Sequence, residues 1–304
     1  MTTLQRAVTV EDHPAAFLRR FADLDNLRHF PRPDGHRLVC RTAFISDTHL
    51  GSLGARADAL VEVLDRLECE RLYLVGDIID MWQLRRRWRW SEACDRAIGR
   101  ILQMARTGTD VVYIPGNHDE AARRFVGLEF GGVRIRALAE HTTADGRRLL
   151  VTHGDQFDLV IRHSPLLCML GDVAYNGLIR INTVWNRLRR LFGRPYWSLS
   201  AYVKSRVKTA CTFVSRFEEA VEHEAARQQL DGVVCGHIHQ AEIRDSADGV
   251  AYYNCGDWVE SCTLLVERDS GTLELIDGLS LVDERPTAED AARRAPQAIS
   301  ATAS

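Results

Sequence analysis

Two histidines, His237 and His239, follow a short apolar run and a glycine in the stretch GVVCGHIH. The same arrangement, an apolar run followed by a polar cluster, occurs at four earlier places in the chain. Those four clusters are Asp47 with His49, Asp77 with Asp80, Asn117 with His118 and Asp119, and His153. Carboxylate, imidazole and amide groups are ligands of borderline divalent cations such as Mn²⁺, Fe²⁺ or Zn²⁺. The pattern therefore indicates a metal site assembled from distant parts of the sequence.

The apolar runs before the clusters have the composition of buried strands. Strands are predicted over 41–47, 71–77 and 110–117, and the spacing of apolar residues predicts helices over 57–68 and 91–106. Strands that alternate with helices indicate a layered α/β domain. Ligands of such domains bind beyond the carboxyl ends of the strands, where the clusters stand. In the D-x-H and H-x-H pairs both side chains project to the same side, so a pair can bind one cation.

A second group of strands follows. Residues 133–155 have the pattern of paired strands around an Ala-Asp-Gly turn. Further strands are predicted over 232–239, 241–245, 250–258 and 262–278. We therefore expect a second sheet to follow the first.

Three segments lie outside this strand pattern. Residues 1–39 are predicted to form an N-terminal extension, and residues 285–304 a disordered tail, on either side of a domain over 40–284. Within this domain, about 157–230 is predicted to be an inserted helical cap. Over 157–216 the cap has ten Arg or Lys residues against two Asp, mixed with large apolar side chains. This composition is typical of helices on anionic membranes or around acyl chains, with a solvated hairpin and single-stranded nucleic acid binding as alternatives.

The whole-chain composition excludes several classes of protein. The 304 residues are 45% hydrophobic with a formal net charge of -3, so no overall positive field favours nucleic acid as a partner. The N-terminus lacks the apolar core of a signal peptide, and no stretch approaches the roughly 20 apolar residues of a spanning helix. The eight scattered cysteines are expected to be reduced. We expect a cytoplasmic protein, with peripheral contact at the inner face of a membrane left open.

In this order, the motifs D-x-H, G-D-x-x-D, G-N-H-D, H-G-D and G-H-x-H resemble those of the calcineurin-like metallophosphoesterases, over residues 42–278. The resemblance implies a four-layer α/β/β/α sandwich with two divalent metal ions, manganese being expected and iron or zinc alternatives. Two neighbouring cations would clamp phosphate oxygens and lower the pKa of bound water. The implied ligands of one ion are Asp47, His49, Asp77 and His239, and those of the other are Asp77, Asn117, His153 and His237. His118 is then the candidate general acid, oriented by Asp80.

Three further stretches resemble the UDP-2,3-diacylglucosamine pyrophosphatase-like branch of this family. They are the cap between H-G-D and G-H-x-H, DLVIRHSPLL after the first of these motifs, and NCGDWVESCT after the second. The resemblance implies cleavage of the amphipathic substrate UDP-2,3-diacylglucosamine to UMP and a lipid 1-phosphate, a step of lipid A synthesis. From composition alone, the cap residues predicted to contact phosphate or sugar are Asn176, Arg180, Asn182 and Arg187. No nucleic acid partner is expected, and the oligomeric state is left open.

The chain departs from these patterns at two places. Met81 and Trp82 stand where phosphatases of the superfamily usually carry an arginine, which disfavours a phosphoprotein substrate. His118 stands where the best-known enzymes of the lipid reaction carry an arginine. The alternatives are a soluble phosphodiesterase or nucleotide pyrophosphatase of other specificity, and a non-catalytic binding scaffold. The stretch MWQLRRRWRW is either a rim for an anionic, amphipathic ligand or a solvated basic helix with aromatics facing the core.

Overall fold

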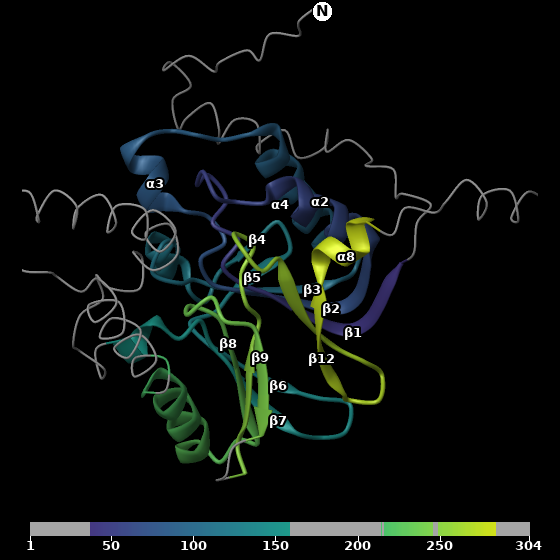
Figure 1. Ribbon diagram of the computed structural model, residues 1–304, viewed down its shortest axis with the longest axis vertical. Helices are drawn as coiled ribbons and strands as arrows, with labels where there is room; N and C mark the ends of the chain where they lie inside the picture. The colour runs from purple at the N-terminus through teal and green to yellow at the C-terminus, as the bar shows by residue number, and fades with distance from the viewer. Residues whose placement is uncertain (1–36, 159–213, 215, 246–248, 284–304) are drawn as a thin grey trace, which may run out of the picture.

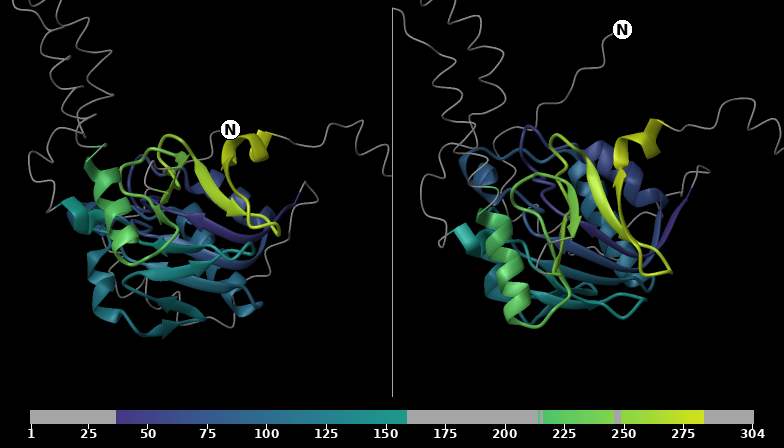
Figure 2. Two further views of the ribbon diagram at one scale, coloured as in Figure 1. Left: turned by 90° about the horizontal axis from the view of Figure 1, so that it is seen from below. Right: turned by 60° about the horizontal axis from the view of Figure 1, so that its bottom comes forward.

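Two β-sheets pack face to face in the computed structural model, which describes residues 37–158, 214, 216–245 and 249–283 (Figure 1). The first sheet has seven strands in the order β12-β11-β1-β2-β3-β5-β4, and the second has five in the order β6-β7-β8-β10-β9. Helices lie against the outer faces of the sheets, as the turned views show (Figure 2).

The first sheet has a parallel centre. Strands β1 (Leu38–Ile45), β2 (Leu67–Val75), β3 (Asp110–Ile114) and β5 (Val133–Ile135) run parallel to one another. Antiparallel strands complete its two edges: β4 (Glu129–Phe130), β11 (Thr263–Glu267) and β12 (Leu273–Asp277). Ile45 pairs with Leu74, and Val75 pairs with Ile114, so β1, β2 and β3 end at one edge of the sheet. Their carboxyl ends therefore present their loops together.

The second sheet repeats this design. Its strands are β6 (Ala139–Thr142), β7 (Arg148–Val151), β8 (Gly232–Cys235), β9 (Glu242–Asp245) and β10 (Ala251–Asn254). Strands β7, β8 and β10 are parallel, and β6 and β9 are antiparallel edge strands.

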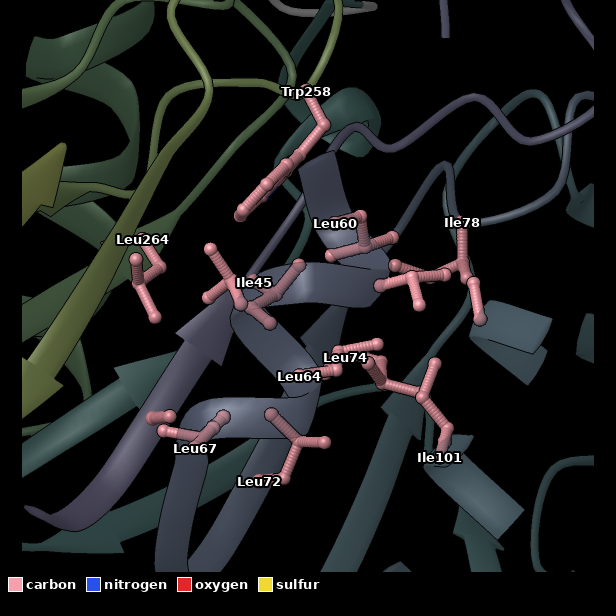
Figure 3. Packing of buried hydrophobic residues seen from close by; sticks show 14 of the residues in the cluster. Ile45, Leu60, Leu64, Leu67, Leu72, Leu74, Ile78, Ile101, Trp258 and Leu264 are labelled. Atoms are coloured by element: carbon pink, nitrogen blue, oxygen red, sulfur yellow. The ribbon is translucent and has the colours of Figure 1, made fainter. Parts of the chain in front are cut away.

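Three hydrophobic layers hold the sandwich together. The outer face of the first sheet packs against α2 (Ala57–Arg66), α4 (Glu92–Arg106) and α8 (Gly278–Asp283), with Leu64 and Ile101 in that layer (Figure 3). Phe44 and Val234 lie between the two sheets. The outer face of the second sheet packs against a helix over 216–227, through Phe217 and its neighbours. These layers confirm the four-layer α/β/β/α architecture.

Local sequence accounts for the α4 boundaries. The Ser91 side chain accepts a hydrogen bond from the Cys94 amide, which caps the first turn. Glu92 and Asp95 in that turn, and Arg106 in the last turn, complement the helix dipole. By contrast, α2 passes straight into β2, because its C-cap residue Leu67 is already extended.

The expectation that the later strands form only a second sheet was wrong in two places. Strands β4 and β5 extend one edge of the first sheet, and β11 and β12 return to its other edge beside β1. The apolar pattern of a strand predicts that the strand is buried, but it does not predict which strand it pairs with or in which sheet. In β11, Leu264 faces the helical layer and Leu265 faces the layer between the sheets, so this strand is buried on both sides.

Several predicted segments lie outside the described residues. They are most of the predicted extension, the cap over 159–213, and the predicted tail, including Asn176, Arg180, Asn182 and Arg187. Among the described residues, six cysteines are free, and no helix combines the length and apolarity needed to cross a membrane.

Candidate metal centre

The candidate ligands lie on loops that start at the carboxyl ends of strands in both sheets. Asp47 follows β1, Asp77 follows β2, His153 follows β7 and His237 follows β8. Backbone hydrogen bonds join the first two loops, because the Asp47 amide donates to Gly76 O at 3.0 Å and the His49 amide to Asp77 O at 2.9 Å. The sheet edge therefore brings together residues that are far apart in the sequence.

The backbone is left-handed at five of the predicted ligands. The φ angles are 53° at Asp47, 44° at His49, 52° at Asp77, 70° at His237 and 55° at His239. Each such residue costs on the order of 1–2 kcal/mol relative to a right-handed conformation, because its Cβ crowds the backbone. A fold retains strain of this kind where a side chain must point in a required direction.

One group of ligand atoms contains Asp47, His49 and His239. All three ligand atoms lie within 4.8 Å of one another. The His239 Nε2 atom is 3.2 Å from Asp47 Oδ1 and 3.2 Å from His49 Nε2. One carboxylate oxygen and two imidazole nitrogens thus point toward a common space.

A second group contains Asp47, Asp77 and His153, again within 4.8 Å of one another. His153 Nδ1 donates a hydrogen bond to Val75 O at 2.9 Å, since a carbonyl can only accept. When the ring is deprotonated for metal binding, this bond keeps the remaining proton on Nδ1 and leaves the lone pair on Nε2, which lies 3.5 Å from Asp77 Oδ1. The imidazole is therefore oriented as a metal ligand would be.

Asp77 lies at the middle of the site. Besides the group with Asp47 and His153, it belongs to a third group with His49 and His118. Its Oδ2 atom is 3.8 Å from His49 Nε2 and 4.0 Å from His118 Nε2. Its Oδ1 faces His153 and its Oδ2 faces His49, and a carboxylate whose two oxygens face different histidines is suited to bridge two cations.

Besides His118 Nδ1, three buried polar atoms at this site, all on predicted metal ligands, have no hydrogen-bond partner in the described part of the chain. They are Asp47 Oδ1, Asn117 Oδ1 and His153 Nε2. An unsatisfied buried acceptor is costly, and a cation would use all three lone pairs. The donor set of carboxylates, imidazoles and one amide fits a borderline divalent metal.

The charges at the site also favour a cation. Burial lowers the pKa of His49, but contacts with Asp47 and Asp80 outweigh burial and raise it to about 10. For His153, burial is outweighed by the Asp77 carboxylate, and its pKa also rises to about 10. Without a cation, protons balance the buried carboxylates, and metal binding would displace these protons.

His118 lies beside this group and contacts two further residues. Its Nδ1 atom is 3.2 Å from Asp80 Oδ1, and its ring centroid is 4.4 Å from that of Trp82. Asp80 also lies 3.4 Å from His49 Nδ1 and accepts the Gln83 amide at 2.9 Å. Burial opposes ionisation of Asp80, but the contacts with the two histidines and this amide outweigh it and lower its pKa.

The sequence model of the family described as calcineurin-like phosphoesterase matches residues 40–241. The chain belongs to the calcineurin-like phosphoesterases. It is accordingly a metal-dependent hydrolase of phosphoric esters or anhydrides.

Relatives of this phosphoesterase carry a more specific name. A protein of Porphyromonas gingivalis named UDP-2,3-diacylglucosamine hydrolase is 24% identical over 243 residues, covering 71% of this chain and 89% of the relative. A protein of Xanthomonas campestris pv. campestris with the same name is 26% identical over 260 residues, covering 77% and 98%. Among solved structures, an archaeal phosphodiesterase aligns with 14% identity and a TM-score of 0.38, covering 77% of this chain and 98% of its own.

The structure places His237 differently from the other predicted ligands of this phosphoesterase. Its ring lies beside that of His153, with centroids 5.2 Å apart. Its Nε2 atom, however, is 2.9 Å from both carboxylate oxygens of Asp158. The predicted residues that the structure groups by ligand atoms are Asp47, His49, Asp77, His118, His153 and His239.

Two buried aspartates received no role from the sequence. Asp119 accepts the Gly116 amide at 2.6 Å and the Ile78 amide at 2.8 Å, which ties the loops after β2 and β3 together. Asp257 accepts the Val259 and Glu260 amides at 2.7 and 2.6 Å. The signal that marks both is an aspartate directly after a strand-end motif, in GNHD and CGDW.

Glycines in the motifs provide space for the ligands. A Cβ at Gly116 would overlap Asp77 Oδ1 and His153, and a Cβ at Gly236 would overlap Asp47 Oδ2. The G-N-H and G-H-x-H motifs therefore need glycine because ligand side chains pack directly on its backbone.

Proposed function

We propose that this phosphoesterase hydrolyses the pyrophosphate of a UDP-linked, acylated glucosamine, such as UDP-2,3-diacylglucosamine. The observation that carries the hydrolytic part is the position of Asp77, whose Oδ1 lies 3.5 Å from His153 Nε2 and whose Oδ2 lies 3.8 Å from His49 Nε2, one histidine of each predicted ligand set. The substrate part is supported by relatives of that name, which align over 71% and 77% of the chain.

The bonds made and broken are those of anhydride hydrolysis. The oxygen of water bonds to one phosphorus, the bond from that phosphorus to the bridging oxygen breaks, and its electron pair stays with the second phosphate. The two protons of water pass to the medium or to the product phosphates, and one of them can replace the proton that a general acid gives to the departing oxygen. The products are UMP and an acylated glucosamine 1-phosphate.

We infer two divalent ions, with Mn²⁺ the proposed metal. The first would be held by Asp47, His49, Asp77 and His239, and the second by Asp77, Asn117, His153 and His237. For His237, this role requires Nε2 to exchange the Asp158 carboxylate for the metal. Two such ions polarise phosphate oxygens and lower the pKa of bound water.

His118 is the proposed general acid. Its Nδ1 is turned toward Asp80, so the proton available for transfer is the one on Nε2, on the side of Asp77. Its side chain is 21% exposed, whereas that of His153 is 1% exposed. His118 is therefore accessible to a substrate, and Asp80 orients its imidazole.

The proposed substrate also suggests where in the cell the enzyme acts. An acylated sugar nucleotide is amphipathic, and the basic, apolar composition of residues 157–216 suits such a ligand or an anionic membrane surface. Within this segment Asn176, Arg180, Asn182 and Arg187 are the proposed contacts to phosphate or sugar. The enzyme would then act at the cytoplasmic face of the inner membrane.

His118 supports a second candidate function. A histidine at this position is the general phosphoesterase pattern, and it favours a phosphodiesterase or nucleotide pyrophosphatase of other specificity. The two candidates differ only in the groups on either side of the scissile bond.

A substrate comparison tests the proposal. The full-length protein with Mn²⁺ is incubated with UDP-2,3-diacylglucosamine, UDP-glucose, a cyclic nucleotide and bis(4-nitrophenyl) phosphate, and the products are identified by mass spectrometry. We expect the diacylated compound to have the highest kcat/KM and to yield UMP. Turnover of the unacylated compounds alone would reject the lipid substrate. An Asp77→Ala preparation shows how much turnover comes from contaminants.

A further inference from the structure

A small pocket lies between the loop after β1 and the segment formed by the short helix α3 (Met81–Arg86) and the residues that follow it. Its lining consists of Gly51, Ser52, Leu53, Gln83, Arg87 and Arg89. The lining has two guanidinium groups, a hydroxyl and an amide, and no carboxylate.

Both segments that line the pocket continue along the chain into residues of the candidate metal centre. On one side, Gly51 follows the predicted ligand His49 by two residues, and a Cβ on Gly51 would come within 2.8 Å of Leu84. This close approach packs α3 directly on the loop. On the other side, α3 begins at its N-cap Asp80, the residue that contacts both His49 and His118.

Helix α3 also contacts His118, the proposed acid. The indole of Trp82, in the first turn, lies against the imidazole of His118 with an interplanar angle of 30°. The Met81 amide donates to His118 O at 3.2 Å. The segment that lines one wall of the pocket is therefore continuous with the helix that contacts the proposed acid.

The two arginines of the pocket have no partner of opposite charge in the described part of the chain. No hydrogen bond or ion pair joins the side chain of Arg87 or Arg89 to another described residue, whereas Arg96 and Arg123 pair with Asp58 and Asp155. A guanidinium fork binds phosphate in two places at once, so two unpaired forks in a pocket without carboxylates favour an anion.

We propose that this pocket binds the phosphate that leaves, and thereby makes the enzyme selective for phosphoanhydrides over simple phosphodiesters. When an anhydride is hydrolysed, the bridging oxygen departs on a second phosphate, which gains negative charge as the bond breaks. When an ordinary diester is hydrolysed, the leaving group is an alcohol or phenol with no such phosphate. Only the anhydride presents a second phosphate group, with two or more oxygens for a guanidinium fork, to Arg87 and Arg89. This inference rests on the proposed function and adds the residues that select the pyrophosphate.

The test compares Arg87→Gln and Arg89→Gln with the matched control Arg86→Gln. Arg86 is an exposed residue at the end of α3, directly before Arg87, and it does not line the pocket. We expect each pocket variant to lower kcat/KM for UDP-2,3-diacylglucosamine about tenfold to a hundredfold, the loss typical of a charged hydrogen bond. The loss on bis(4-nitrophenyl) phosphate should be at least fivefold smaller. Equal losses on both substrates, or none on the anhydride, would overturn the proposal.

A binding measurement separates this inference from the proposed function. UMP and glucosamine 1-phosphate, the two kinds of leaving phosphate, are titrated by calorimetry into the full-length, metal-loaded protein and its variants. We expect Arg87→Gln to raise the Kd of one of them about tenfold, which identifies the group that leaves, with Arg86→Gln unchanged. If neither Kd rises, the pocket proposal fails whatever the turnover. If the Kd rises but the lipid substrate is not cleaved, only the proposed substrate fails.

Discussion

The Oδ1 atom of Asp80 lies 3.2 Å from Nδ1 of His118, and the same oxygen accepts the backbone amide of Gln83. Asp80 therefore both orients the proposed acid and caps α3. These two roles can be separated by mutation, because Asn caps a helix as well as Asp does but carries no charge.

Asp80→Asn is accordingly expected to keep the cap of α3, to lose the part of the folding free energy that comes from the ionised carboxylate, and to lose activity. We expect kcat to fall about tenfold, and to fall about a hundredfold in His118→Gln, since general acid catalysis contributes on that order. The decisive measurement compares phenyl with 4-nitrophenyl phosphodiesters. A general acid is needed less for the better leaving group, so equal losses on both esters would contradict the role of His118.

Metal content should distinguish Asp77 from the ligands on either side of it. Wild-type protein is expected to bind two metal ions per chain by elemental mass spectrometry. Asp77→Ala should lower occupancy at both positions, because Asp77 belongs to two groups of ligand atoms. His239→Gln should retain about one ion, since it belongs to one group. Equal retention in both variants would argue against a bridging Asp77.

Metal binding should also stabilise the fold. A ligand that binds only the folded state adds about 2.7 kcal/mol to the free energy of unfolding at a concentration 100 times its Kd. Adding Mn²⁺ to chelator-treated wild-type protein should therefore raise the unfolding temperature. In the Asn117→Ala, His153→Ala double variant, which loses two of the unpaired buried acceptors, the rise should be smaller. An equal rise would place the metal elsewhere.

Stability at acid pH should depend on Glu267, which lies between the sheets and pairs with Thr42 in the middle of β1. Burial raises the pKa of Glu267, but hydrogen bonds from His141, Thr42, Arg41 and the Ala144 amide outweigh burial and lower it from 4.5 to about 2. A lowered carboxyl pKa stabilises the fold above pH 4.5, and this stabilisation is lost as the pH falls toward 2.

We therefore expect the free energy of unfolding, measured by urea denaturation with tryptophan fluorescence, to fall between pH 4.5 and 2. Glu267→Gln should be less stable at neutral pH and show a shallower pH dependence in this window. Glu129→Gln, a change at an exposed position on β4, is the matched control and should keep the wild-type slope. A wild-type slope in Glu267→Gln would show that other groups cause the acid sensitivity.

The helix over 216–227 ends in a Schellman motif with a residue that is poorly suited to it. Gln229 has a φ of 57°, its amide donates to Ala226 O at 2.9 Å, and the Leu230 amide donates to Ala225 O at 3.0 Å. Gln229→Gly should raise the free energy of unfolding by about 0.5–1 kcal/mol, because glycine adopts this conformation without strain. Gln229→Ala keeps the strain and should give no such gain in thermal unfolding.

By itself, the sequence determined the kinds of ligand, their positions after strands, and the layered α/β class. These properties follow from local chemistry, because Asp, His and Asn residues after apolar runs can be recognised in the sequence without knowing which strands pair. The residues Asp47, His49, Asp77, His118, His153 and His239 were all predicted in this way, and the structure brings their ligand atoms together.

Only the tertiary structure decided which atoms meet and which strands are neighbours. The return of β11 to the side of β1, the contact of His237 with Asp158, and the stacking of Trp82 on His118 join residues across long separations in sequence. The left-handed backbone at Asp47 and Asp77 likewise depends on hydrogen bonds between loops. Such relationships arise from the pairing of whole sheets, so no local pattern of residue types encodes them.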